Sequence, residues 1–532
     1  MTFSFRCVGL EGKTNVAVVT NRRTFIGGAA LVCAGIPLLA SCSSILGEKR
    51  ELPIPPLAPF EMDGDVKVFT LHAQSGVTEH VPGKQTPTWG FEGPYLGPTV
   101  RVREGETVRI NIVNGLDVMT TIHWHGMQVP PECDGGPHQP IEPGETWSPQ
   151  WTISQQAAMV WYHPHPHGLT GLHAYRGLAG PLIIDDDNSD GLDLPRDYGV
   201  DDIPLALTDV RLNSDGTRDE MDLPDLGLLG DISLANGINN AVFHATTRRV
   251  RLRVLDGSTM RMYNLAFKDG RTFYQIGSDS GLLNNPIALN RIVLSPGERA
   301  DIIVDLEPGE TVVLQDQKFP DDLGLPNRPT TPDFGIDDKF DVLTMVGPPE
   351  DANLPEPGPL PDNMNPSADE FPDLTGAPER YFALKGFRIN DEVMDMQRVD
   401  FAVDHPGWEV WNFDNNDIDW LHNMHVHDCA FRIISLRNAN SQVMVDGWKD
   451  TVLLPPGAIA KVAVRFNPEF HSTRWPYMLH CHMLYHEDMG MMSQFMVVQP
   501  GEVPDEVIGD GVEGSSELNA RTGISDYSGH GH

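Results

Sequence analysis

The segment HCHMLYHEDMGMM, from His480 to Met492, places one cysteine between two histidines. His486 follows Cys481 by five residues, and Met491 follows it by ten. A thiolate, an imidazole and a weak thioether, joined by one further histidine, make the ligand set of a blue-copper site. The spacing therefore predicts that Cys481, His486 and Met491 bind one copper ion. Zinc also suits cysteine and histidine, but zinc gives no reason for the methionine.

The same segment can reach a second metal. If it is a strand that runs into a loop, its side chains alternate between two faces. Cys481 then points to one side, while His480 and His482 point to the other. One tripeptide could thus contact two metal centres and connect them through a few covalent bonds.

Three further histidine clusters can supply the missing ligands. They are HWHG at 123–126, WYHPHPHG at 161–168 and WLHNMHVHD at 420–428. Each contains a His-x-His pair, and on a strand both imidazoles of such a pair share one face. For a single pair, chance clustering among the 20 histidines of the chain is the simpler explanation. Four clusters, one of them built around a cysteine at blue-copper spacing, favour metal binding.

In their order and placement, the four clusters resemble the four copper-binding motifs of the multicopper oxidases. That family includes laccases, bilirubin oxidases and bacterial copper efflux oxidases. The resemblance covers roughly residues 60 to 500. It implies an enzyme with four copper ions per chain. A type 1 copper would take electrons from a small reducing substrate, and a trinuclear cluster of one type 2 and two type 3 coppers would reduce O₂ to water.

The resemblance also implies a role for each ligand. Type 1 copper would be bound by His422, Cys481, His486 and Met491, and type 2 copper by His123 and His425. One type 3 copper would be bound by His125, His163 and His482, and the other by His165, His427 and His480. His167 follows the second motif but matches no ligand of the family, so we expect it to lie behind the ligands or at the surface.

Two acidic residues match positions that family members use near the trinuclear cluster. Asp134 lies nine residues after His125, and Glu487 directly follows His486. Carboxylates beside a metal site can relay protons, and reduction of O₂ to water consumes protons. The resemblance therefore implies that Asp134 and Glu487 are catalytic residues. The alternative is that they only orient the ligands by hydrogen bonds.

The rest of the chain predicts an all-β protein. Short apolar runs are bounded by turn residues, as in TVRVREGETVRINIVN from Thr99 to Asn114. The resemblance implies three cupredoxin-like Greek-key β-sandwich domains. We place these domains at 60–187, 201–348 and 379–500, with a Pro-rich linker at 42–59, a Pro/Asp-rich linker at 349–378 and a polar tail at 501–532.

The N-terminus indicates a targeting segment. Arg22 and Arg23 precede a small apolar stretch that ends in LASC at 39–42, which predicts a twin-arginine signal over 1–41 and a bacterial lipobox at Cys42. The apolar run of roughly 16 residues is short of the about 20 that span a membrane. We expect export of the folded protein to the periplasm or cell surface, with a lipid on Cys42 as its only link to the membrane. An ordinary signal peptide cut nearby, or an uncleaved anchor, is the alternative.

The net charge of the chain limits the classes of partner that it can bind. The formal net charge of the chain is -37, which argues against nucleic acid and anionic membrane surfaces. It is compatible with metal ions, aromatic amines or phenols as reductants, although carboxylates that merely keep the surface soluble explain it equally well. The expected partners are O₂ and one small reductant, and we expect the chain to be a monomer.

Two cysteines are left once the leader, the lipobox and Cys481 are accounted for. Cys133 and Cys429 each lie a few residues beyond a histidine cluster, one in the first domain and one in the third. In an oxidising compartment such a pair can form a disulfide, which here would join the two domains that share the trinuclear cluster. Two unpaired buried thiols are the alternative.

The substrate is the least determined feature. Copper efflux oxidases carry a Met-rich insert and Met or Asp residues just before the third motif, whereas this chain has Ile418 and Trp420 there. Bilirubin oxidases resemble it in the tryptophan. A laccase-like oxidase of phenols, aromatic amines or tetrapyrroles is therefore our first expectation, and a cuprous oxidase in copper tolerance is the alternative. An electron-transfer or copper-storage protein would leave the trinuclear histidines without a use, and a structural cell-division protein of this fold would have lost them.

Overall fold

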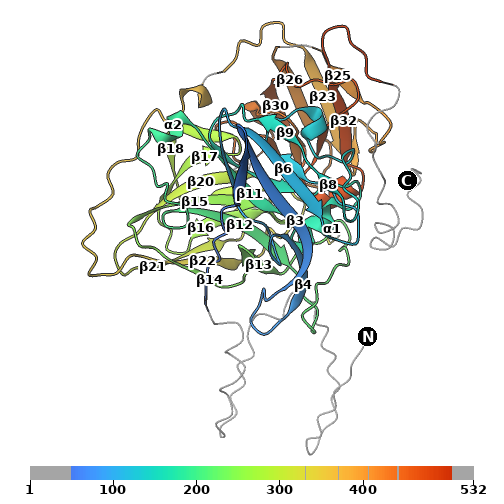
Figure 1. The fold of residues 1–532 in the computed structure, drawn as a ribbon. Helices are drawn as coiled ribbons and strands as arrows, with labels where there is room; N and C mark the ends of the chain where they lie inside the picture. The colour runs from blue at the N-terminus through green and yellow to red at the C-terminus, as the bar shows by residue number, and fades with distance from the viewer. Residues whose placement is uncertain (1–48, 330, 370, 405–406, 440–442, 506–532) are drawn as a thin grey trace, which may run out of the picture. The chain divides into compact units, whose positions relative to one another are not determined.

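The computed structural model describes residues 49–329, 331–369, 371–404, 407–439 and 443–505 (Figure 1). The predicted signal segment, Cys42 and nearly all of the predicted polar tail lie outside these residues. In the part of the chain that is described, no helix is both long enough and apolar enough to cross a membrane.

The prediction of an all-β fold with three cupredoxin-like sandwiches is confirmed. Six sheets occur in the described residues. Apart from β1, their strands fall into three consecutive pairs of sheets along the chain, coloured blue to cyan, green to yellow and orange to red in Figure 1. In each pair, the inward-facing side chains of both sheets form one hydrophobic core. Burial of apolar surface between two sheets is the main favourable term for such a domain.

The first domain contains the sheets β2-β3-β6-β8 and β5-β11-β10-β7, with β4 and β9 paired to β3 and β6. Alternate residues of β6 are buried, so the period of two that marks TVRINIVN in the sequence is the period of its packing. The strands are β2 (Phe60–Asp63), β3 (Val66–Thr78), β4 (Thr86–Phe91), β5 (Val100–Arg103), β6 (Thr107–Asn114), β7 (His123–His125), β8 (Thr146–Trp147), β9 (Gln150–Thr152), β10 (Ala158–His163) and β11 (Gly180–Asp185).

The second domain contains the sheets β13-β12-β15-β20-β17-β18 and β1-β14-β22-β21-β16-β19. Strand β1 comes from the segment that the sequence predicted as a linker, and it pairs in parallel with β14. The strands are β1 (Arg50–Glu51), β12 (Asp202–Val210), β13 (Ile232–Ala235), β14 (Ala241–His244), β15 (Arg249–Asp256), β16 (Tyr263–Phe267), β17 (Phe273–Ser278), β18 (Gly281–Leu289), β19 (Ile292–Leu294), β20 (Arg299–Asp305), β21 (Thr311–Asp316) and β22 (Phe340–Val346).

The third domain contains the sheets β24-β23-β26-β30-β28 and β25-β32-β31-β27-β29. Its core also takes in side chains from the second domain, among them Met260, Met262 and Phe334, so the two domains share apolar packing. The strands are β23 (Glu379–Lys385), β24 (Arg388–Ile389), β25 (Phe401–Val403), β26 (Glu409–Asn415), β27 (His422–Val426), β28 (Arg432–Arg437), β29 (Thr451–Leu454), β30 (Ile459–Val464), β31 (Tyr477–Cys481) and β32 (Met492–Val497).

Helices are few and short in the described residues: α1 (Thr170–Arg176), α2 (Asp187–Asp190) and α3 (Leu484–Asp488), with 3₁₀ turns at Pro131–Cys133 and Pro366–Ala368. Helix α1 of the first domain contacts α3 of the third. The carboxylate of Asp488 accepts the backbone N–H groups of Thr170 and Gly171 at 2.8 and 3.1 Å. These are unpaired N–H groups of the first turn of α1, so the bonds satisfy a helix end and join the two domains.

The predicted disulfide between Cys133 and Cys429 is wrong: both are free thiols in the structure. The physical reason is packing. Cys133 belongs to the core of the first domain, where its Sγ lies 3.7 Å from the carbonyl oxygen of Gln150. Cys429 belongs to the core of the third domain. Each sulfur is therefore a small apolar side chain of its own sandwich.

We predict that neither thiol reacts in the folded protein and that both react after unfolding without reductant. Burial raises the pKa of Cys133 to about 11 and that of Cys429 well above its usual value, so little thiolate is present at neutral pH. Alkylation under native and denaturing conditions, followed by peptide mass mapping, measures this directly. Peptides of Cys133 and Cys429 that stay linked until a reductant is added would contradict it.

Candidate metal centre

The third and fourth sequence clusters meet on neighbouring strands of one sheet. Strand β31 ends at Cys481 and pairs antiparallel with β27, which begins at His422; Met424 lies opposite Cys481, and His425 lies opposite His480. Directly opposed residues in a sheet are close neighbours, so register alone brings His425 and His480 together. The structure thus joins clusters that lie about sixty residues apart in the chain.

A mononuclear group forms on one side of this strand pair. The Nδ1 atoms of His422 and His486 lie 3.7 and 3.6 Å from the Sγ of Cys481. His486 is carried by α3, which begins three residues after the end of the strand. Met491 is fully buried in the same core, and its carbonyl oxygen accepts the N–H of Cys481 at 3.1 Å. The three N and S atoms lie close enough to share one ion.

The surroundings orient this group. The carboxylate of Asp417 lies 2.8 Å from Nε2 of His422, which leaves Nδ1 to face the sulfur. Trp420 stacks on the ring of His486, with ring centroids 5.2 Å apart. Burial raises the pKa of Cys481 to about 12, so an ion that binds there must displace the thiol proton.

The remaining histidines gather between the first and third domains. Ring pairs from the two domains stack face to face: His123 on His427 and His125 on His425, with centroids 3.7 Å apart in both cases. Three groups have their nitrogen atoms close enough to share an ion, namely His123 with His125 and His425, His125 with His163 and His482, and His165 with His427 and His480. The last two groups are the triads that the sequence predicted as type 3 ligands.

Backbone carbonyls fix which nitrogen faces the centre of the cluster. The Nδ1 atoms of His123, His163 and His425 lie 2.9, 2.8 and 2.9 Å from the carbonyl oxygens of Asp134, Pro164 and Asp450. A carbonyl only accepts, so each Nδ1 carries the hydrogen and each Nε2 keeps its lone pair. All three Nε2 atoms are buried and have no hydrogen-bond partner in the protein. Buried lone pairs without a donor are what a metal ion satisfies.

The triad of His165, His427 and His480 is also arranged to bind a metal ion. Nε2 of His480 lies 3.2 Å from Nε2 of His165 and 3.2 Å from Nε2 of His427. Their Nδ1 atoms face carboxylates: that of His427 lies 2.8 Å from Asp134, and those of His165 and His480 lie 3.4 and 3.1 Å from Glu487. Three imidazole lone pairs that converge on one point repel each other unless a cation lies between them. The donor set suits a copper ion.

Seven of these rings are available as neutral ligands. Burial lowers the pKa of His165 and His480 to about 3 and that of His425 to about 4. It also holds the pKa values of four others, His125, His163, His427 and His482, well below the usual value. Neutral imidazole is the form that binds metal.

The two predicted acids lie at the cluster, and His167 lies behind it. Asp134 touches the ligand histidines His123 and His427, and Glu487 bridges His165 and His480. Both carboxylates are almost fully buried. His167 is half-buried and joins none of the nitrogen groups found in the described residues.

Sequence reasoning missed two carboxylates that hold ligands. Asp417 orients His422, as described above. Asp450 lies 3.1 Å from Nε2 of His125 through its side chain and binds Nδ1 of His425 through its backbone. Asp450 and His125 are 325 residues apart, so no spacing rule could have linked them. The acid five residues before His422 was a local signal that could have been used.

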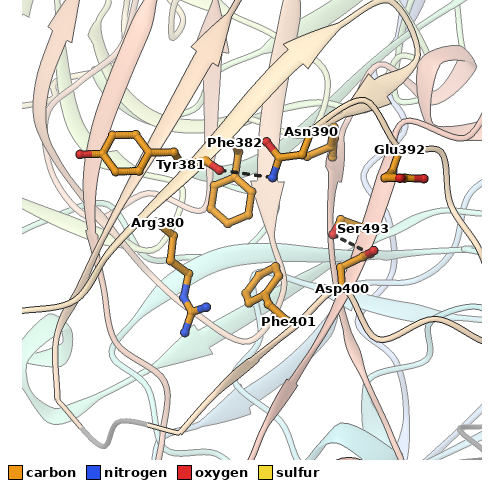
Figure 2. Close-up of a pocket in the computed structure, with 9 residues that line it drawn as sticks. Arg380, Tyr381, Phe382, Asn390, Glu392, Asp400, Phe401 and Ser493 are labelled. Carbon is orange, nitrogen blue, oxygen red and sulfur yellow. Dashed lines mark hydrogen bonds between the residues drawn. The ribbon is translucent and has the colours of Figure 1, made fainter.

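A surface pocket of about 290 Å³ lies elsewhere in the third domain (Figure 2). Its charged groups already have partners: Arg380 binds Glu409, and Asp400 accepts from Ser493 and Arg398. None of its lining residues is a histidine or cysteine, so we assign it no part in metal chemistry.

Known proteins resemble the chain over most of its length. Two models of the multicopper oxidase family match residues 73–189 and 363–501. A multicopper oxidase of Staphylococcus haemolyticus is 33% identical over 460 residues, covering 84% of this chain and 93% of that protein. The cell division protein FtsP of Yersinia pestis is 32% identical over 489 residues, covering 90% and 98%. The crystal structure of a laccase from Pediococcus acidilactici superposes with a TM-score of 0.75 at 34% identity, covering 85% of this chain and 94% of that one. With its histidine and cysteine groups assembled as described, the chain belongs to the multicopper oxidase family.

Proposed function

We propose that this copper- and O₂-dependent oxidoreductase is laccase-like and oxidises phenols, aromatic amines or tetrapyrroles. The observation that carries the proposal is the pair of buried donor groups, one built on Cys481 and one built from eight histidines between two domains. In each group the nitrogen or sulfur atoms lie close enough to share an ion, and in the histidine group the Nε2 atoms of His123, His163 and His425 have no protein partner. Copper bound in them would take single electrons from the substrate and pass them to O₂.

The proposed ligand assignment follows the sequence. Cys481, His422, His486 and Met491 hold type 1 copper, and His123 and His425 hold type 2 copper. His125, His163 and His482 hold one type 3 copper, and His165, His427 and His480 hold the other. The nitrogen groups described above support these sets. Because Cys481 is bonded in the chain to His480 and to His482, a short covalent path connects the two sites.

Aromatic side chains near His486 support an aromatic substrate. Trp420 lies over His486 and against Phe387, whose ring centroid is 4.8 Å away. Trp420 and Phe387 are half-buried, whereas the rings of His422 and His486 are fully buried. A substrate would therefore contact Trp420 first, and a planar ring can stack there. The Asp417 carboxylate beside His422 would accept a phenol or amine proton.

Asp134 and Glu487 are the proposed proton donors for O₂ reduction. Each carboxylate touches two ligand histidines on the side away from the lone pairs, as described above. Burial raises the pKa of Glu487, although the nearby His165 opposes this. A carboxyl group that holds its proton more firmly than usual is suited to deliver it at neutral pH.

A structural role in cell division is the second class to weigh, since FtsP is a close relative in length and identity. A purely structural protein has no use for buried imidazoles that lack partners, because unpaired polar groups in a core cost stability. The intact donor groups of this chain therefore favour the enzyme.

We predict that Cys481→Ser removes the blue colour and the oxidase activity but not the fold. Serine cannot supply the thiolate on which a blue-copper site depends. Absorption spectra and circular dichroism of the copper-loaded wild type and variant test this, with Cys133→Ser as a matched control that keeps its colour. A blue Cys481→Ser protein would refute the assignment.

We predict that Glu487→Gln and Asp134→Asn stay blue and are still reduced rapidly by substrate, while turnover with O₂ falls by about 10²- to 10⁴-fold. The amides keep the shape of each side chain and remove its proton. Stopped-flow reoxidation of the fully reduced enzyme measures the affected step. Wild-type reoxidation rates in both variants would limit these residues to orienting the histidines.

We predict that Trp420→Ala lowers kcat/KM for a phenol by about 2- to 12-fold, because an aromatic contact contributes roughly 0.5–1.5 kcal/mol. Tyr381→Ala, at an exposed ring in the pocket of Figure 2, serves as the control. Oxygen consumption with phenols, bilirubin and cuprous ion as reductants gives the measurement. Turnover of cuprous ion alone would replace the laccase-like proposal with the cuprous oxidase alternative.

A further inference from the structure

We propose that the second domain, which contributes no copper ligand in the assignment above, positions the trinuclear histidines through Arg299. This inference rests on the proposed function. Arg299 is the first residue of β20, and we call Ser295–Glu298, which connects β19 to β20, the β19–β20 turn. This turn lies next to both donor groups, whose ligands belong to the first and third domains.

The guanidinium of Arg299 is fixed by every hydrogen it has. It donates to both carboxylate oxygens of Asp450 at 2.7 and 2.6 Å. The other three N–H groups bind the carbonyl oxygens of Met159, Gly297 and Asp279 at 3.2, 2.9 and 2.6 Å. The side chain is 1% exposed. Because all five N–H donors have acceptors, the guanidinium can take only one orientation. Arg299 of the second domain therefore holds Asp450 in place.

Asp450 in turn orients two imidazoles, and it does so through different ring nitrogens. Its carboxylate accepts from Nε2 of His125, whose Nδ1 is left buried and without a partner. Its carbonyl accepts from Nδ1 of His425, whose Nε2 is left free in the same way. Neither acceptor can donate, so one residue determines which nitrogen each histidine offers to copper.

The backbone of the turn touches the ligands directly. Gly297 has a φ of +87°, and a Cβ at this position would lie 3.0 Å from ring atoms of both His125 and His482. Any larger residue would be strained and would also push these two rings. Because Gly297 has no side chain, the backbone of the second domain can pack directly against the histidine rings.

The same turn reaches the mononuclear group. The side-chain amide of Asn423 donates to the carbonyl oxygen of Pro296 at 2.7 Å, and its oxygen lies 3.6 Å from the Sγ of Cys481. The backbone carbonyl of Asn423 accepts the N–H of His482 at 2.8 Å. One turn thus contacts the surroundings of both proposed copper sites.

Buried charges anchor the turn. The ammonium group of Lys449, next to Asp450, lies 2.8 Å from Asp279 and 2.9 Å from Glu298. Asp279 also accepts the backbone N–H of Arg299 at 2.8 Å. All four side chains are at most 1% exposed. Removing one member would leave its partners charged and unpaired in the interior, so the network resists displacement.

Arg253 supplies a matched control in the same domain. It binds Asp202 through two bonds of 2.6 and 3.0 Å, and both residues are buried. In the part of the chain that is described, its ionic partners are Asp202 and Asp301 rather than a histidine. Loss of this pair tests the cost of a buried arginine alone.

The test compares full-length, copper-loaded Arg299→Lys and Arg299→Gln with Arg253→Lys. Copper per chain, the type 1 absorption band, the type 2 electron paramagnetic resonance signal, O₂ consumption and Tm are measured on each. For the Arg299 variants we expect the blue band to persist, while affinity for the cluster coppers and O₂ consumption fall by about 10- to 100-fold. Arg253→Lys should keep every copper signal even if its Tm falls.

Two results would overturn the inference. One is an unchanged type 2 signal in both Arg299 variants, and the other is a loss of the blue band and of the cluster coppers together in these variants, in proportion to the fall in Tm. If the Arg299 variants do not fold, Gly297→Ala decides by the same selective loss, which a merely structural role would not produce. A wild type that binds no copper would instead refute the proposed function, and this inference with it.

Discussion

The metal centre depends on one constraint: imidazole lone pairs that repel each other are held together in a buried space. His165, His427 and His480 point their Nε2 atoms at one another from two domains, at 3.2 Å from His480 to each of the others. A hydrogen bond from Nδ1 of His427 to Asp134, and close contacts of the Nδ1 atoms of His165 and His480 with Glu487, hold the rings in this orientation. The first and third domains therefore meet around groups that do not attract one another, and a bound cation would turn this repulsion into cohesion.

The second domain helps to hold the ligand histidines in place. Arg299 and the buried ion pairs of Lys449 hold Asp450, and Asp450 orients His125 and His425. Apolar side chains of the same domain complete the core around Cys481. A domain without ligands can thus determine how well the ligands of its neighbours are arranged.

Relatives with similar identity carry different names, one a multicopper oxidase and another a cell division protein. A fold does not by itself determine function, which depends on the site built on it. In this chain the eight histidines and Cys481 are all present, and hydrogen bonds to carbonyl or carboxylate oxygens orient several of the histidines.

The sequence by itself predicted the all-β fold and the residues of each donor group. The fold follows from short apolar runs bounded by turn residues, and the spacing from His480 to Met491 marks one donor group. The division of the histidines among the copper ions came from the resemblance to the multicopper oxidases. Only the tertiary structure revealed Asp450 and Arg299 as residues behind the ligands, because strand pairing and domain packing bring them in from distant positions. Asp417 lies five residues before His422, where the sequence did carry a local signal. It also corrected the expected link between Cys133 and Cys429. Two cysteines that follow similar motifs need not meet when each packs inside its own core.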